Sequence, residues 1–208
     1  MTSASQSLVA ELDSTLRKAS SSKHRTILCS VTDLFLRGAQ SYSQDLITVF
    51  GDVIDRLLEN IERPALIELS AKLAPINNAP VKVIGHLSCN DDIAVSGPIL
   101  SKSDALTDKI LFEVAKTKGQ LHLAAIVGRP RISETITDIL VDRGNSDIAR
   151  MVVANQGARL SELGFVKLIK RAESDGELAT AIANRKDIPD ELRPFLKRLI
   201  ATEAVVST

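Results

Sequence analysis

Apolar residues recur at intervals of three and four along the first sixty positions, which is the spacing of one face of an α-helix. Serine-rich and glycine-containing segments at residues 20–22 and 37–41 separate three such patterns. The first carries Leu8, Leu12 and Leu16, the second Ile27, Leu28, Val31, Leu34 and Phe35, and the third Leu46, Phe50, Val53, Ile54, Leu57 and Ile61 after a capping Ser43. Three amphipathic helices with short loops predict an N-terminal helical segment over residues 1–62.

From Pro64 onward the helical patterns become shorter, and their starting points recur. Spacings of 27, 26, 28 and 28 residues separate five starts, at Pro80, Thr107, Ser133, Ser161 and Pro189. Threonine and serine hydroxyls can cap a helix, and proline fits its first turn. Seven residues after each start comes an apolar residue, and we expect all five to be buried: Leu87, Val114, Leu140, Leu168 and Leu196.

A second helical pattern precedes each start, so the segments form pairs. The expected pairs are 64–74 with 79–88, 91–101 with 106–118, 120–128 with 132–143, 147–155 with 160–172, and 177–184 with 189–201. Two short helices repeated at this period are typical of an α-solenoid. We therefore predict an all-α fold with about five HEAT-like helical hairpins over residues 63–208, and a kink at Pro98. Ordinary hairpins of an irregular bundle are the alternative.

Composition narrows the classes of partner. The chain carries 26 basic and 26 acidic residues, so it has no overall basic field that would attract nucleic acid or anionic lipid. Aromatic residues make up 3% and tryptophan is absent, which disfavours base stacking. Cys29 and Cys89 are too few for a disulfide framework. With no signal-peptide pattern and no membrane-length apolar segment, we expect a cytoplasmic protein.

Two histidines deserve comparison with known chemistries. His86 and Cys89 have the spacing of two metal ligands, but no second ligand pair is visible. We interpret them as a helix-end histidine and a buried thiol. His24 resembles the phospho-accepting histidine of two-component signalling, although Arg25 replaces the usual acid and Thr26 follows by two positions instead of four. We interpret His24 as a surface residue.

No catalytic constellation is visible in the sequence. There is no Gly-x-Ser-x-Gly turn, no phosphate-binding glycine loop and no paired carboxylates outside helix starts. We therefore predict a non-enzymatic protein with no catalytic residue, no cofactor and no metal.

Basic residues in the turns between paired helices form the first candidate binding surface. They are Arg129, Arg131, Arg159, Arg185 and Lys186, and in a stack they would line one edge. Such an edge suits a carboxylate-rich protein or a phosphate backbone; turn charges that only face water are the alternative. Nine residues after the helix starts, Lys116, Asp142, Lys170 and Arg198 mark a second candidate surface. Leu163, Val166 and Phe195 are expected to add exposed apolar area there, which also suits a homodimer contact.

Several stretches resemble a bacterial family known as domain of unknown function 2336. They are residues 31–36, 78–80, 91–100, 122–126, 141–144 and 185–189 (VTDLFL, NAP, DDIAVSGPIL, HLAAI, VDRG and RKDIP). The resemblance extends over nearly the whole chain and implies a helical, HEAT-like fold. It implies no catalytic or ligand-binding residue.

These patterns favour a helical-repeat scaffold that binds another protein in bacterial signalling or regulation. The first alternative is a nucleic-acid-binding HEAT-like protein that uses the basic turn residues. The second is a phosphotransfer or small-molecule role centred on His24.

Overall fold

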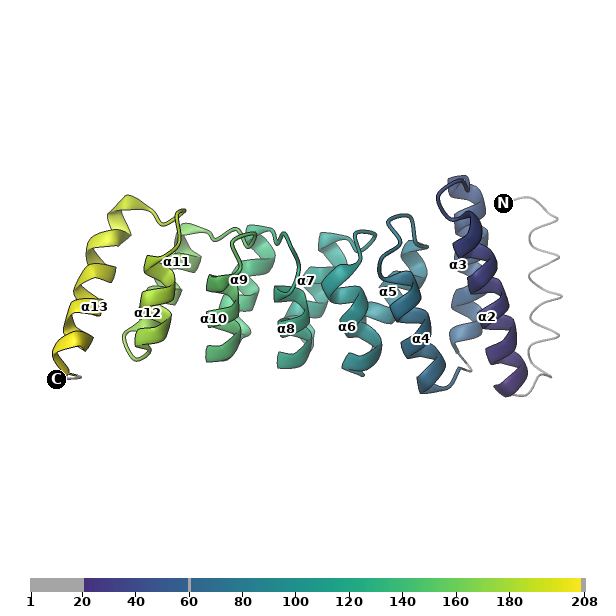
Figure 1. The fold of residues 1–208 in the computed structure, drawn as a ribbon, viewed down its shortest axis with the longest axis horizontal. Helices are drawn as coiled ribbons and strands as arrows, with labels where there is room; N and C mark the ends of the chain where they lie inside the picture. Colours follow the sequence, from purple (N-terminus) through teal and green to yellow (C-terminus); the bar gives the residue numbers. More distant parts are fainter. Residues whose placement is uncertain (1–20, 60, 207–208) are drawn as a thin grey trace. The chain divides into compact units, whose positions relative to one another are not determined.

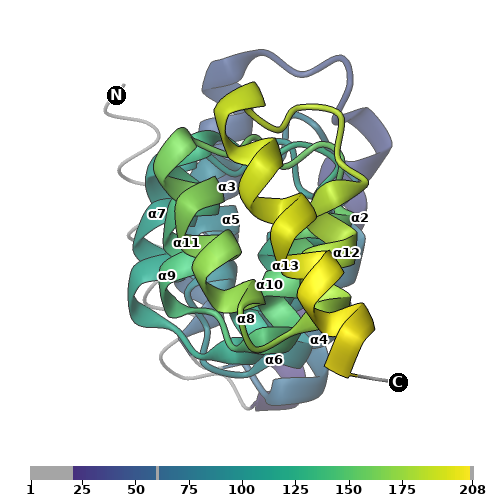
Figure 2. The same cartoon turned by 90° about the vertical axis from the view of Figure 1, so that its left-hand side faces the viewer.

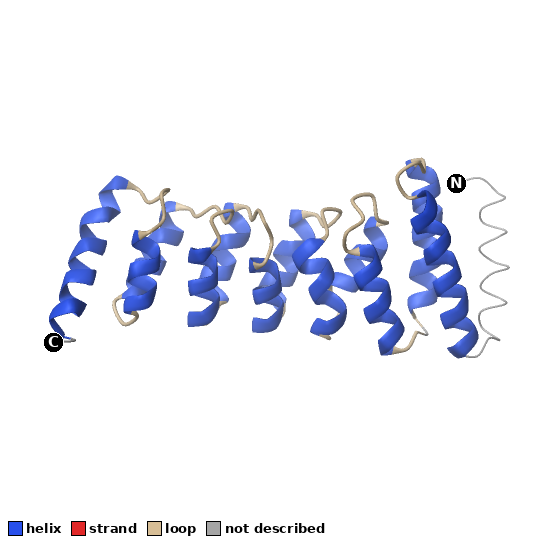
Figure 3. Ribbon diagram, in the orientation of Figure 1, coloured by secondary structure: helices blue, strands red, loops and turns tan. Residues whose placement is uncertain are grey.

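The computed structural model describes residues 21–59 and 61–206, and all regular elements within these ranges are helices (Figures 1 and 3). The predicted all-α class is therefore confirmed. The chain forms two compact units, residues 1–107 and 108–208. The predicted helix of Leu8, Leu12 and Leu16 lies outside the described residues. The predicted domain boundary between residues 62 and 63 falls within the first unit and stays a prediction.

The first unit contains five described helices. They are α2 (Ser21–Gly38), α3 (Gln44–Leu58), α4 (Arg63–Leu73), α5 (Val81–Ser88) and α6 (Ile93–Lys102). Helix α2 packs against α3 and α4, α3 against α5, and α4 against both α5 and α6. Helices two apart in the sequence thus become neighbours, as α3 with α5 and α4 with α6.

Two contacts position α3: aromatic packing against α2 and the connecting loop, and a close approach of its backbone to the start of α5. The ring of Phe50 lies 5.5 Å from that of Phe35 on α2 and 5.4 Å from that of Tyr42 in the connecting loop, between centroids. These separations are typical of favourable aromatic pairs. On the other side of α3, a Cβ atom at Gly51 would lie 2.8 Å from Cβ of Pro80. Glycine therefore lets α3 approach the start of α5.

The second unit repeats one arrangement through seven α-helices. They are α7 (Asp108–Thr117), α8 (Gln120–Val127), α9 (Glu134–Arg143), α10 (Ser146–Ala154), α11 (Glu162–Ala172), α12 (Gly176–Ala183) and α13 (Arg193–Val206), with a 3-10 turn, η1 (Asp190–Leu192), before α13. Helix α9 packs between α7 and α11, and α10 between α8 and α12. Within this unit, α7, α9 and α11 form one layer and α8, α10 and α12 the other (Figure 2).

The helix phase read from the sequence is confirmed. The five apolar side chains expected inside are all buried: Leu87 and Val114 are 1% exposed, Leu140 and Leu168 are 0% exposed, and Leu196 is 2% exposed. The observed helices also match the predicted pairs to within a few residues at most ends. The solenoid and its HEAT-like character stay predictions, as does the kink at Pro98, through which α6 continues.

The helix starts differ from one another in a way that the sequence did not reveal. The Ser161 hydroxyl accepts a hydrogen bond from the backbone N–H of Gly164 at 2.9 Å and caps α11 as predicted. The Ser133 hydroxyl does not cap α9, and this buried oxygen has no partner among the described residues. Pro80 precedes α5 as its N-cap, and Pro189 precedes the 3-10 turn instead of an α-helix.

Two connecting loops of the second unit pair through their backbones. The N–H of Ile132 donates to the carbonyl of Gly157, and the N–H of Arg159 donates to the carbonyl of Ile132, both at 3.0 Å. Ile132 and Ala158 thus form an isolated parallel β-bridge. A Cβ atom at Gly157 would lie 1.8 Å from the carbonyl oxygen of Pro130. Only glycine fits there, because the two backbones are too close for a side chain.

Replacing Leu168 tests this packing. Leu168→Ala removes a fully buried side chain from α11, so we expect the free energy of unfolding to fall by about 2–5 kcal/mol. Lys170→Ala, two positions along the same helix and exposed, is expected to change it by less than about 0.5 kcal/mol. Denaturant unfolding in dilute solution measures both variants. Equal losses for the two variants would contradict the helix phase.

Candidate functional site

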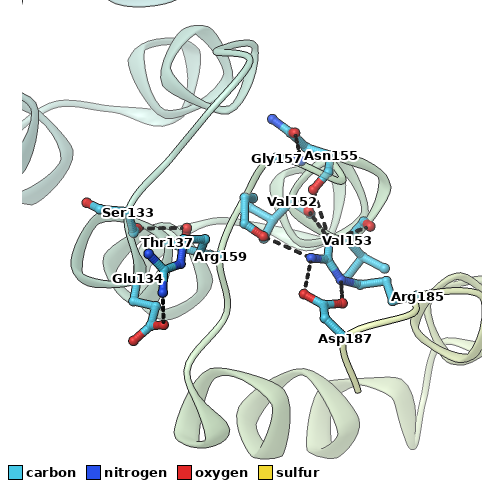
Figure 4. A network of polar contacts seen from close by, with 11 residues as sticks. Ser133, Glu134, Thr137, Val152, Val153, Asn155, Gly157, Arg159, Arg185 and Asp187 are labelled. Carbon is cyan, nitrogen blue, oxygen red and sulfur yellow. Dashed lines mark hydrogen bonds and ion pairs between the residues drawn. The ribbon is translucent and has the colours of Figure 1, made fainter. Parts of the chain in front are cut away.

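Arg185, one of the predicted turn cations, is buried. Arg185 lies just after the end of α12. Its side chain is 2% exposed and points toward the end of α10 (Figure 4). The guanidinium donates to the backbone carbonyls of Val153 at 3.0 Å, Asn155 at 2.9 Å and Ala158 at 2.8 Å. The prediction that Arg185 lies on an accessible edge is therefore wrong, because its hydrogens are used to satisfy backbone oxygens.

Asp187 balances the buried charge of Arg185. Its two carboxylate oxygens accept hydrogen bonds from Nε and Nη2 of the guanidinium at 2.8 and 2.7 Å. This bidentate pairing holds the pKa of Asp187 below its usual range, because the hydrogen bonds favour the ionised carboxylate. The pair therefore presents little net charge to a partner.

Asn155 makes an equivalent connection one helix pair earlier. It follows α10, and its Nδ2 donates to the carbonyls of Val127 at 2.7 Å and Arg129 at 2.8 Å, at the end of α8. Arg129 follows α8 in the same way and is only 9% exposed. Arg129 is thus the second predicted surface cation that proves to be buried. In the layer of α8, α10 and α12, a polar residue one or two positions after each helix is buried or half-buried.

The other layer contains a matching series that the sequence reading missed. Arg143 at the end of α9 donates from Nη1 to the carbonyls of Ala115 and, at 3.0 Å, Lys118, around the end of α7. Arg171 near the end of α11 donates from Nη1 to the carbonyls of Val141 and Gly144, both at 2.9 Å. The sequence contained one indication of this series: Arg143 and Arg171 are 28 residues apart, and each lies in the last turn of a helix.

Three predicted turn cations remain exposed: Arg131, Arg159 and Lys186. The Arg159 guanidinium lies 3.4 Å from the carboxylate of Glu134, so its charge is partly balanced. The expected basic edge is therefore much weaker than the sequence suggested.

The four residues of the second predicted surface lie on α7, α9, α11 and α13, one on each helix. Lys116, Asp142, Lys170 and Arg198 all face solvent. Nζ of Lys116 lies 6.0 Å from the ring centroid of Phe112, and Nζ of Lys167 lies 2.5 Å from Oδ1 of Asp142. Lys170 and Arg198 lie on α11 and α13, which are in contact.

Exposed apolar side chains gather on these two helices. Leu163 and Val166 on α11 are 58% and 47% exposed, and Phe195 on α13 is 56% exposed. The prediction that these three residues are exposed is confirmed. We call these exposed residues of the two contacting helices, Leu163, Val166, Lys170, Phe195 and Arg198, the α11/α13 face. It comprises three apolar and two basic side chains.

His86 and Cys89 line an open pocket in the first unit. The pocket has a volume of about 710 Å³ and also borders Asp55, Lys82, Asn90 and Asp91. Nδ1 of His86 lies 3.1 Å from Oδ1 of Asp55. Cys89 is exposed, so its interpretation as a buried thiol is wrong. Within residues 21–59 and 61–206, no three His, Cys, Asp or Glu side chains are placed to hold a metal ion.

His24 is 5% exposed on α2, so its interpretation as a surface residue is wrong. An imidazole that accepts a phosphoryl group must reach its donor, and burial of this one does not favour such a role.

Comparison with known proteins agrees with the resemblance noted in the sequence. Residues 95–202 match a family described as "Uncharacterised protein conserved in bacteria (DUF2336)". The chain belongs to this family. The match includes all of α7 to α12 and therefore Arg143, Asn155, Arg171 and Arg185, which connect the helix ends of the second unit. No curated protein and no solved structure matched the chain. In the part of the chain that the structure describes, no helix is long and apolar enough to cross a membrane.

Arg185 provides a direct test of the buried connections. Arg185→Ala leaves several buried carbonyls and Asp187 without their donor, so we expect a loss of about 3 kcal/mol in the free energy of unfolding. Arg131→Ala removes an exposed arginine from a neighbouring turn and is expected to cost less than about 0.5 kcal/mol. Urea unfolding followed by circular dichroism measures both. A surface role for Arg185 would instead make the two variants equally stable.

Proposed function

We propose that this protein is a non-enzymatic helical-repeat scaffold that binds another protein, in bacterial signalling or regulation. The observation that supports the proposal is the group of exposed apolar side chains in the second unit. Leu121 on α8 and Met151 on α10 are 65% and 39% exposed, in addition to the three apolar residues of the α11/α13 face.

The chemistry of the α11/α13 face suits a protein partner. Covering apolar surface contributes roughly 25 cal/mol per Å² removed from water, so Leu163, Val166 and Phe195 supply a driving force. A large exposed aromatic ring such as that of Phe195 is a frequent anchor of binding energy. Lys170 and Arg198 on the same two helices would contribute to orientation and to the rate of encounter.

The repeated packing supports the same proposal. Side chains at the helix ends connect consecutive helices in both layers, as Arg171 and Arg185 do. A surface that is already ordered loses less conformational entropy when it binds than a mobile one. The outward residues of the second unit therefore form a preorganised surface for recognition.

In vivo photocrosslinking tests the proposal. A photoreactive amino acid at Leu121 or Leu163 in the native bacterium is expected to form an adduct with another polypeptide, detected as a heavier band and identified by mass spectrometry. Asp147, a polar exposed position on α10, serves as the control and is expected to give little or none. If both apolar positions capture nothing more than Asp147 does, the scaffold proposal fails.

Nucleic-acid binding is the second candidate, and the exposed turn cations Arg131, Arg159 and Lys186 are the observation that favours it. Burial of Arg129 and Arg185 removes two of its five predicted contacts. We expect no binding of duplex DNA or RNA in fluorescence anisotropy at low salt. Binding that falls steeply with salt and disappears in the Arg131→Ala/Arg159→Ala/Lys186→Ala variant would instead establish this alternative.

A further inference from the structure

Helix α8 carries no charged residue, yet part of it faces solvent. The segment Gln120–Val127 contains no aspartate, glutamate, lysine or arginine. Leu121 is 65% exposed, the highest value among the large apolar side chains that the structure describes. A helix that is apolar on every side is typically covered on every side. The outward side of α8 therefore has the composition of a helix surface that another element covers.

The outward side of α10 continues this apolar area. Met151 is 39% exposed, and Ala154 is also exposed. In α8 and in α10 the buried residues occupy one side, which faces the layer of α7, α9 and α11 (Figure 2). The exposed residues of the two helices therefore point away from that layer, and the helices pack directly against each other. We call the following residues the α8/α10 surface: Leu121, Ala124, Ala125, Met151 and Ala154.

The opposite layer has a different kind of outward side. Three of the four exposed residues of α9 are charged, namely Glu134, Asp142 and Arg143, and the fourth is Thr135. On the α8/α10 surface, by contrast, no residue is charged and no side chain offers a strong hydrogen-bonding group. This difference between two layers of the same unit indicates that the α8/α10 surface is adapted to a partner and not to water.

We propose that the α8/α10 surface binds an amphipathic α-helix of another protein. The apolar side of that helix packs against Leu121 and Met151, and a lysine or arginine at its border pairs with Asp147. The three alanines of the surface let the partner helix approach closely, since the distance between helix axes depends on the side chains at the contact. This inference rests on the proposed protein-binding function and names the class of partner.

The chemistry of the surface favours a helix over an extended peptide. An extended chain must pair its backbone N–H and C=O groups with its binding site, and leaving them unpaired against apolar surface costs free energy. The leucine, methionine and alanine side chains of the α8/α10 surface cannot pair them, and the backbone groups of α8 and α10 are engaged within their own helices. A helix satisfies its own backbone and presents apolar residues at intervals of three and four, which is how amphipathic helices bind apolar surfaces.

The free charge beside the surface is negative. Asp147 precedes Met151 by one helical turn, is exposed, and forms no ion pair among the described residues. The nearby Arg150 is engaged, because its guanidinium lies 3.0 Å from a carboxylate oxygen of Asp175 and 3.2 Å from one of Glu177. An acidic helix or a phosphate backbone would meet repulsion here, whereas a basic side chain is attracted. Because lysine and arginine are long, they reach Asp147 from a backbone that lies over the apolar residues.

Peptide selection on the intact chain tests the inference. Phage-displayed random peptides of about 20 residues, long enough for roughly five turns of helix, are selected on the wild type and depleted on the Leu121→Asp/Met151→Asp variant. We expect the retained peptides to share apolar residues at helical spacing together with lysine or arginine. A proline substituted in the middle of such a peptide is expected to abolish binding, because proline breaks a helix.

Fluorescence anisotropy with one retained peptide then compares single variants. Leu121→Asp and Met151→Asp are each expected to raise the Kd by about tenfold or more, since each places a charge against the apolar side of the helix. Asp147→Lys is expected to raise it by about fivefold or more through repulsion of the basic residue. Leu163→Asp, at a similarly exposed apolar position on α11, is the matched control and is expected to leave the Kd unchanged. Circular dichroism checks that each variant is folded.

Three results of the selection overturn the inference: no peptide is retained, the retained peptides tolerate proline, or they carry acidic residues in place of basic ones. Phosphatidylcholine vesicles that bind the wild type and not the Leu121→Asp/Met151→Asp variant would assign the surface to lipid and overturn it as well. Crosslinking judges the proposed function separately. An adduct from Leu121 to a non-helical segment of another protein preserves that function and overturns this inference, whereas selected basic helices without any adduct overturn the function alone.

Discussion

The second unit depends on the pairing of backbone carbonyls at the ends of its short helices. A helix leaves its last four carbonyls without intrahelical partners, and burying such groups unpaired costs free energy. Helices α8 to α12 have only eight to eleven residues, so these ends are a large part of each element. Arg143, Asn155, Arg171 and Arg185 supply donors from the next helix of the same layer. The helices that pack against each other are therefore also the helices whose backbone carbonyls are paired by each other's side chains. Each helix of such a contact depends on its neighbour for both.

Because arginines such as Arg185 are buried in these connections, the positions of basic residues in the sequence were a poor guide to the binding surface. Arg185 and Arg131 look alike in the sequence, since both lie in turns between helical segments. One is buried against carbonyl oxygens and the other is exposed. Ion pairs between successive helices also balance many of the charges, as between Arg150 and Asp175 at 3.0 Å. A net charge of zero therefore says little about which cations remain free to bind, because ion pairs within the fold occupy some of them.

The helical class and the inward phase of the helices were predictable because they depend on local periodicity. Leu140 and Leu168 lie seven residues from a helix start, and that spacing alone indicated burial. The environments of His24, Cys89 and Arg185 were not predictable in this way, because each depends on which residue of another helix lies opposite. The α11/α13 face was partly predictable: spacing placed Leu163, Val166 and Phe195 outward.

The paired loops around Gly157 have a consequence for how this protein can change over evolution. Connecting loops ordinarily tolerate insertions and deletions. Here the backbone bridge between Ile132 and Ala158 and the contact at Pro130 set the length of the turn after α10. A single added residue would shift that register and displace Gly157 from the one position where it fits. Length variation in this part of the chain is therefore expected to occur by gain or loss of whole helix pairs, which leaves each turn intact.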